Sequence, residues 1–190
     1  MRRSKKRDHL VDVALQLFYR HGFHATGIDQ IVAEAGIARM TLYKHFPSKV
    51  DLIVATLERR DDNFRSWLFG YMENQETSRD KILSLFDALD LWFKGEAFPE
   101  QSFFGCMFIN ASAEFSNPEH PAHKVAARHK VLLKDHLEKI IQGAGISSSE
   151  VLSSQLLLLK EGAIVTAQVS GDLEAANGAK RIAEMLLDTA

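Results

Sequence analysis

The sequence predicts an all-α protein built from two helical domains. Apolar residues recur at helical spacing through most of the chain, and no stretch alternates with the period of a β-strand. Glycine and proline positions divide the chain into about nine such segments. The chain has 190 residues, 46% hydrophobic and 25% charged, which is ordinary for a globular protein. We expect one domain over residues 1–57 and a second over residues 58–190.

Charge is distributed unevenly along the chain. Residues 1–50 contain nine Lys and Arg against four Asp and Glu, a balance of +5. Residues 51–190 contain fourteen against twenty-one, a balance of −7, which gives the net charge of −2. A basic N-terminal part followed by an acidic remainder is typical of a protein whose N-terminal part binds a polyanion. For residues 1–7, a mobile arm that follows DNA and a solvated tail both remain open.

The sequence argues against a membrane span, a secretory signal and an intrachain disulfide. No run of about 18 apolar residues appears, so we expect no membrane span and no membrane partner. The basic N-terminus lacks the apolar segment of a secretory signal. The single cysteine, Cys106, excludes an intrachain disulfide and fits a reducing compartment. We therefore expect a cytoplasmic protein.

Residues 1–57, which we call the head, are predicted to contain a helix-turn-helix. Thr26 with Asp29 resembles a capping box at the start of the second helix, and Gly36 is the left-handed residue that ends it. In the third helix, Leu42 and Phe46 point inward. Two short helices joined by a glycine turn place the second one in the DNA major groove. The predicted helices of the head cover residues 8–20, 28–35 and 38–46.

The same stretch resembles a known family. Residues 26–52, TGIDQIVAEAGIARMTLYKHFPSKVDL, look like the N-terminal DNA-binding domain of the tetracycline-repressor (TetR) family of bacterial regulators. The most telling part is TLYKHF over residues 41–46, followed by Ser48 and Lys49. The resemblance covers roughly residues 8–57. It implies a dimeric transcriptional regulator, usually a repressor that a small-molecule effector releases from DNA.

Candidate DNA contacts are the polar residues of the recognition helix and of the neighbouring helix starts. Arg39 can pair with guanine bidentately, and its position resembles one that reads bases in the family. The other side chains contact bases or phosphates, with orphan N–H groups of the helix starts beside them. For Tyr43, the alternative is that its ring only fills the core. The full set is Thr26, Arg39, Thr41, Tyr43, Lys44, His45 and Lys49.

One long helix joins the two predicted domains. It covers residues 48–72, begins at the cap residue Ser48, and has a polar waist over residues 58–63. This helix is either a lever between domains or a rigid strut. Residues 103–115 leave almost no polar face, so we expect this later helix to be central and buried. Further helices are predicted over residues 79–94, 119–142, 147–170 (opened by a Ser147–Glu150 capping box) and 172–187.

The last two helices predict a dimer interface. They carry more leucine than one small domain needs, and their alanines permit close helix approach. Two helices from each subunit would form a four-helix bundle, and the resulting two-fold symmetry favours a pseudo-palindromic operator. The alternative is a thick internal core. The candidate interface residues are Leu156, Leu159, Ala163, Ala167, Ala179 and Ala183.

The middle helices predict an effector pocket. Aromatic and soft side chains line it in this interpretation, with Glu114 and His136 as further polar groups that orient a ligand. The alternative for each of these residues is plain core. The candidate pocket residues are Trp67, Phe86, Phe93, Phe104, Met107, Phe108, Asn110 and His129.

Other chemistries find little support in the sequence. The His-x-x-His pairs at residues 21–24 and 120–123 lack a third ligand, so we expect no metal and no cofactor. No glycine-rich phosphate loop, His-Glu-x-x-His motif or nucleophile elbow is present, so we do not expect an enzyme. A small all-helical enzyme and an effector-independent DNA binder are the alternatives. Apolar neighbours favour a buried, inert thiol at Cys106 over a redox switch.

Overall fold

The computed structural model describes residues 5–98 and 102–190, and within these ranges it contains nine α-helices and no strand. This confirms the all-α class. None of the helices in the described ranges is long and apolar enough to cross a membrane. The helices are α1 (Lys5–His21), α2 (Ile28–Glu34), α3 (Arg39–His45), α4 (Lys49–Glu73), α5 (Ser78–Phe93), α6 (Met107–Glu114), α7 (Pro121–Gly143), α8 (Ser149–Ser170) and α9 (Ala175–Asp188).

The N-terminal arm is shorter than the sequence predicts. Residues 5–7 form the first turn of α1, whereas residues 1–4 lie outside the described residues. The Arg7 guanidinium lies over the ring of Phe46, 4.9 Å from its centroid, so this basic side chain packs on the head.

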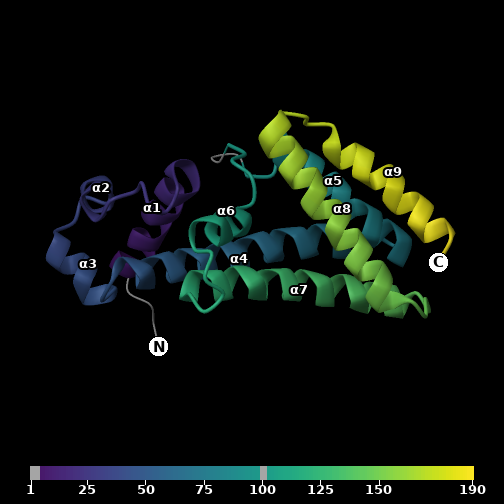
Figure 1. Ribbon diagram of the computed structural model, residues 1–190, viewed down its shortest axis with the longest axis horizontal. Helices are drawn as coiled ribbons and strands as arrows, with labels where there is room; N and C mark the ends of the chain where they lie inside the picture. Colours follow the sequence, from purple (N-terminus) through teal and green to yellow (C-terminus); the bar gives the residue numbers. More distant parts are fainter. Residues whose placement is uncertain (1–4, 99–101) are drawn as a thin grey trace. The chain divides into compact units, whose positions relative to one another are not determined.

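Helices α1, α2 and α3 contact one another and enclose a small apolar core (Figure 1). Arg59 of α4 holds α1 through ion pairs with Asp8 and Asp12. The side chains of this core recur at helical spacing, so the amphipathic pattern of each helix in the sequence predicts which residues form it. Its fully buried side chains include Leu10, Ala14, Phe18, Ile31, Leu42 and Phe46.

The turn between α2 and α3 depends on Gly36. This residue has a φ of +62°, in the left-handed region where a side chain is strained. The amide of Ile37 donates to the carbonyl of Val32 and the amide of Gly36 donates to that of Ala33. This pair of bonds is a Schellman motif, which satisfies the last carbonyls of α2. The predicted glycine stop is confirmed.

Helix α4 begins as predicted, whereas two other predicted capping boxes are absent. Ser48 Oγ accepts the amide of Asp51 at 3.2 Å, and the Asp51 carboxylate accepts the amide of Ser48 at 2.9 Å. The cap of α2 is Gly27, and no side chain caps that helix. Ser148 is likewise the cap of α8 without a side-chain bond, so the Ser147–Glu150 box is wrong.

The predicted helix over residues 103–115 begins four residues late, at Met107. Gly105 has a φ of +83°, which an α-helix does not accommodate. A Cβ at this position would lie 1.9 Å from the Gln168 side chain. Three residues of the observed helix α6 are buried, Met107, Phe108 and Ala111, whereas Ala113 is exposed, so the helix is buried on one side and not all round as the sequence predicted.

Helices α5, α8 and α9 form a layered packing in which α8 and α9 lie side by side (Figure 1). The buried face of α9 consists of small residues, Ala176, Ala179 and Ala183, so its backbone approaches its neighbours closely. An ion pair between Lys180 and Asp87 ties α9 to α5.

Internal contacts divide the chain into two units. The first comprises Met1–Asn63 with Met107–His129, and the second comprises Phe64–Cys106 with Lys130–Ala190. Helix α6 therefore groups with the helix-turn-helix, and the continuous helices α4 and α7 each contribute to both units.

Candidate nucleic-acid interface

Helix α3 presents a polar face to solvent. Leu42 and Phe46 are 0% and 2% exposed, which confirms that they point into the head. Tyr43 is 38% exposed, so its ring does not serve only to fill the core. Arg39 and Lys44 are exposed, and Thr41 and His45 are half-buried. The helix thus offers donors of several kinds along one accessible side.

Arg39 forms an ion pair at the start of α3. Its Nη1 donates to Asp29 Oδ1 at 2.9 Å, and its guanidinium lies 5.9 Å from the centre of the Tyr43 ring. Both members of the ion pair are well exposed. Exposed pairs stabilise by at most about 1 kcal/mol, so the pair orients Arg39 without preventing it from reaching a base.

Met40 is an exposed residue of this face that sequence reasoning missed. It is 72% exposed and directly follows Arg39. An apolar side chain at the start of a recognition helix suits the methyl group of thymine. The sequence could have indicated it, because Met40 is apolar but does not lie on the side of the helix that Leu42 and Phe46 turn inward.

Two predicted phosphate contacts have different environments. Thr26 is fully buried, and its hydroxyl donates to the Gly22 carbonyl at 2.8 Å. This hydroxyl is not presented to a phosphate, and we correct the prediction to a structural role in the turn after α1. Lys49 remains near the surface, where its Nζ donates to the His24 carbonyl at 3.4 Å. Partial burial lowers the pKa of Lys49 from its ordinary value.

Glu114 of α6 binds the turn between α1 and α2. Its carboxylate accepts the amide of Phe23 at 2.9 Å, the amide of His24 at 2.6 Å and the His24 ring nitrogen Nδ1 at 2.7 Å. Burial raises the pKa of Glu114, but these hydrogen bonds outweigh burial and hold it below 4.5. The sequence suggested that Glu114 orients a ligand, whereas the structure assigns it to the head.

We expect Glu114→Gln to lower the free energy of unfolding by about 1–3 kcal/mol, because one backbone amide then faces an NH₂ group. In the wild type, the folded pKa lies below 4.5, so this stabilisation is present above pH 4.5 and is lost as the pH falls below it. Urea unfolding at pH 7 and pH 3 measures both effects. Glu119→Gln, at an exposed ion pair with Lys124, is the matched control. Equal stability of the two variants at pH 7 would contradict the role of Glu114.

The family is decided by comparison with known proteins. Residues 10–56 match the model of bacterial regulatory proteins of the tetR family. The transcriptional regulator YjdC of Escherichia coli is 22% identical over 96% of this chain and 93% of its own. The chain belongs to the TetR family of transcriptional regulators.

Other similar proteins include both a named activator and a named repressor. The transcriptional activator FasR of Mycolicibacterium smegmatis is 34% identical over 46% of this chain, a match that spans 42% of FasR. The repressor ComR of Escherichia coli is 27% identical over 80% of this chain and 83% of its own. A solved TetR-family regulator from Streptomyces coelicolor superposes with a TM-score of 0.80 and 27% identity, over 94% of this chain and 95% of that one.

The TetR-family chain buries most of the predicted dimer residues inside its own fold. Leu156, Ala163, Ala167, Ala179 and Ala183 are at most 7% exposed, and only Leu159 of the set is half-buried. For these five residues the alternative of an internal core is correct, because α9 packs on α5 and α8 through its alanines.

A different set of apolar residues faces solvent on the same two helices. Val169 is 78%, Leu158 72% and Met185 68% exposed. On α8 the exposed residues recur at intervals of seven and four, so they share one side of the helix. We call the following residues the exposed apolar stripe: Val151, Leu158, Val165 and Val169 of α8, with Ile182 and Met185 of α9.

The predicted pocket residues are divided between the two units. Trp67, Phe86, Phe93 and Phe104 belong to the second unit, whereas Met107, Phe108, Asn110 and His129 belong to the first. The second unit has one open cavity of about 310 Å³ at Glu73, Lys81 and His136, and another of about 390 Å³ between α7 and α8. None of the eight predicted residues lines either cavity.

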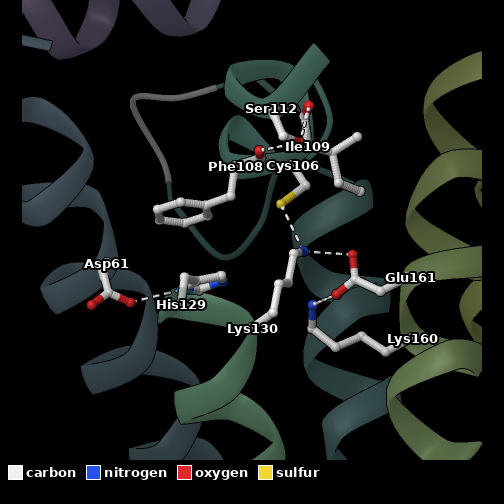
Figure 2. Close-up of polar contacts among 9 residues, drawn as sticks. All are labelled: Asp61, Cys106, Phe108, Ile109, Ser112, His129, Lys130, Lys160 and Glu161. Atoms are coloured by element: carbon white, nitrogen blue, oxygen red, sulfur yellow. Dashed lines mark hydrogen bonds and ion pairs between the residues drawn. The ribbon is translucent and has the colours of Figure 1, made fainter. Parts of the chain in front are cut away.

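His129 is a core residue of the first unit. It is 1% exposed, and its Nδ1 bonds the Asp61 carboxylate at 2.7 Å. Its ring stacks on Phe108 with a centroid distance of 3.7 Å (Figure 2). These contacts support the plain-core alternative for His129 and Phe108.

A cluster of charged residues in the second unit was missed by sequence reasoning. Glu161 bonds both Lys160 and Lys130, and Lys130 Nζ lies 3.5 Å from the sulfur of Cys106 (Figure 2). Lys160 is 1% exposed. Cys106 is 3% exposed, so the expected burial of this thiol is confirmed. The signal was a Lys-Glu pair in the middle of an otherwise apolar helix.

Both histidines of the candidate metal pair at residues 120–123 have protein partners. His120 Nδ1 accepts the amide of Ala122, and the His123 ring bonds the Phe115 carbonyl at 2.8 Å. Among the residues that the structure describes, no group of three His, Cys, Asp or Glu is placed to hold a metal ion.

Proposed function

We propose that this regulator is a homodimeric repressor that binds a pseudo-palindromic operator in the cytoplasm and is released by a small-molecule effector. The observation that carries the proposal is the exposed face of α3, on which Arg39, Met40 and Lys44 lie together in a positively charged N-terminal domain. No residue is assigned a catalytic role.

In this proposal the side chains of α3 divide the work of recognition. Arg39 pairs with guanine, and Met40 contacts a thymine methyl group. Thr41 and Lys44 contact bases or phosphates. Tyr43, His45 and Lys49 bind phosphates and set the register of the helix in the groove.

The exposed apolar stripe supports the homodimer. Large apolar residues at 41–78% exposure along one side of α8 and on α9 are costly to leave in water, and a two-fold contact covers them with a copy of themselves. Two recognition helices about 34 Å apart then read two half-sites one turn apart on the DNA.

Two features support control of the head by an effector. Helix α4 is continuous from Lys49 in the first unit to Glu73 in the second. Glu114 ties α6 to the turn that precedes α2. A ligand that favours a different arrangement of these helices changes the spacing of the two heads and so weakens operator binding.

A gel-shift titration with the DNA upstream of the chain's own gene tests the proposal. We expect sequence-selective binding whose affinity falls steeply between 50 and 200 mM salt. A reporter under the same upstream DNA separates repression from activation. Absence of selective, salt-dependent binding would refute the DNA-binding function, and higher reporter output with the protein would refute repression.

Two substitutions separate base reading from phosphate binding. We expect Arg39→Ala to relax specificity at one base position by about 1–3 kcal/mol, because the bidentate pair is lost. We expect Lys49→Ala to weaken binding to all sequences and to reduce the salt slope by about 1. Titrations of operator variants at several salt concentrations measure both. Uniform weakening by Arg39→Ala would contradict its assignment to a base.

A further inference from the structure

Asp29 is an acidic residue that bonds the recognition helix of the basic head. Its Oδ1 accepts a hydrogen bond from Arg39 Nη1 at 2.9 Å, and the two residues lie in the first turns of α2 and α3. Among the acidic residues of α1 and α2, Asp29 alone pairs with α3 in the described part of the chain. Asp8 and Asp12 pair with Arg59 of α4 instead. The carboxylate of Asp29 thus lies beside the guanidinium group that is proposed to read guanine.

The ion pair leaves hydrogen-bonding groups of both side chains available. Asp29 uses only Oδ1, and its Oδ2 accepts no hydrogen bond from any residue that the structure describes. The carboxylate takes only Nη1 of Arg39, so Nε and Nη2 can still face the O6 and N7 acceptors of guanine. The Asp29 and Arg39 side chains are 82% and 57% exposed, so a base edge can reach both of them.

Contact with DNA changes what this carboxylate requires. In water, Oδ2 is hydrated and the exposed ion pair is weak. When a base edge covers the pair, water leaves, the attraction between Asp29 and Arg39 strengthens, and a carboxylate oxygen without a donor becomes costly. In the major groove, cytosine N4 and adenine N6 offer an N–H donor, whereas guanine and thymine offer only acceptors or a methyl group. An exocyclic amino group is therefore the complement of Oδ2.

We propose that Asp29 reads a second base, by accepting on Oδ2 a hydrogen bond from the exocyclic amino group of a cytosine or adenine next to the guanine bound by Arg39. Successive bases of one strand are about 3.4 Å apart, close to the 2.9 Å between Asp29 Oδ1 and Arg39 Nη1. Because the same carboxylate holds Arg39 through Oδ1, Asp29 is also a positioning residue for the guanine contact. The inference rests on the proposed function, since it requires that α3 lies in the major groove.

Two simpler roles of Asp29 predict different results. An acidic residue in the first turn of a helix stabilises that helix through its dipole. Any acidic residue near DNA also weakens binding to all sequences by repelling phosphates. Neither role depends on the identity of the bases, so the base preference of Asp29 variants separates the proposed role from both.

Titrations of the full chain with duplexes of its selected DNA test the inference. The Arg39→Ala variant identifies the guanine, and each of the four bases is then placed at the two neighbouring positions. At one of them, we expect the wild type to bind cytosine or adenine at least about fivefold more tightly than guanine or thymine on the same strand. N4-methylcytosine or N6-methyladenine at that position, in which a methyl group replaces the major-groove N–H, should also weaken binding at least about fivefold.

Two substitutions of Asp29 remove the acceptor in different ways. In Asp29→Ala, the preference for an amino-bearing base and the effect of the methyl group should fall to about twofold or less, and the preference for the neighbouring guanine should fall in part. The amide of Asp29→Asn offers a donor as well as an acceptor, so this variant should bind guanine or thymine within about twofold of cytosine. It serves if Asp29→Ala does not fold.

Glu34→Ala is the matched control, because Glu34 is an exposed carboxylate at the other end of α2. It removes the same charge and should strengthen binding to all sequences without changing the base preference. Asp29 variants with the base preference of the wild type, or a wild type without preference for an amino-bearing base at either neighbouring position, would overturn the inference while the proposed function stands. A wild type that binds no DNA selectively would overturn both.

Discussion

A chain with Val169→Glu is expected to be monomeric and to bind its operator at least about a hundredfold more weakly than the wild type. Val169 is 78% exposed and lies on the exposed apolar stripe. A two-fold contact brings the same residue from both subunits into one interface, so the substitution buries two carboxylates without partners. A monomer presents a single recognition helix, and the gain from binding two half-sites together is lost.

Sedimentation velocity and a gel shift at the same protein concentrations measure the two effects. Val131→Glu is the control, because Val131 is a 56% exposed valine on α7, outside the stripe. It should leave both the dimer and the operator affinity intact. A dimeric Val169→Glu variant, or equal loss of dimer in the control, would show that the interface lies on another surface.

The head was predictable because its determinants are local. The glycine at position 36 ends α2 through bonds that span six residues, and the inward pair Leu42 and Phe46 is spaced by one helical turn. These signals depend on the chain within one or two turns. A single sequence therefore suffices to place both helices and their exposed face.

The predicted interface residues lie in the core of the protomer because periodicity identifies an apolar face of a helix but not the element that covers it. Ala163 and Ala167 share one side of α8, and Leu158 and Val165 share another. Both sides are apolar, so the pattern alone did not tell which one meets α9 and which one meets solvent. The packing of α9 on α5 and α8 settles the assignment within the protomer.

The charged contacts were not predictable because their partners are distant in sequence. Glu114 binds His24 across 90 residues, and Lys130 binds Glu161 across 31. Neither pair has a spacing that local geometry requires. For Thr26 a local pattern was misleading. The sequence predicted a capping box, but the Thr26 hydroxyl donates to a carbonyl four residues earlier in the chain.

Glu161→Gln is expected to lower the free energy of unfolding by about 3 kcal/mol at pH 7, the largest stability effect of any substitution considered. Burial raises the pKa of Glu161, but Lys160 and Lys130 outweigh burial and lower it from 4.5 to about 2. The side chain is 22% exposed, so little of this interaction is screened by water. The amide removes the carboxylate charge that both ammonium groups share.

The pH dependence separates this electrostatic effect from a packing defect. Since the folded pKa of about 2 lies below the ordinary 4.5, the stabilisation is complete above pH 4.5 and is lost as the pH falls toward 2. The stability difference between wild type and Glu161→Gln should therefore shrink to less than half at pH 3, as urea unfolding at both pH values will measure. Glu150→Gln, at an 80% exposed carboxylate on the same helix, should show neither effect. A difference that stays constant with pH would mean that Glu161 stabilises the fold by shape alone.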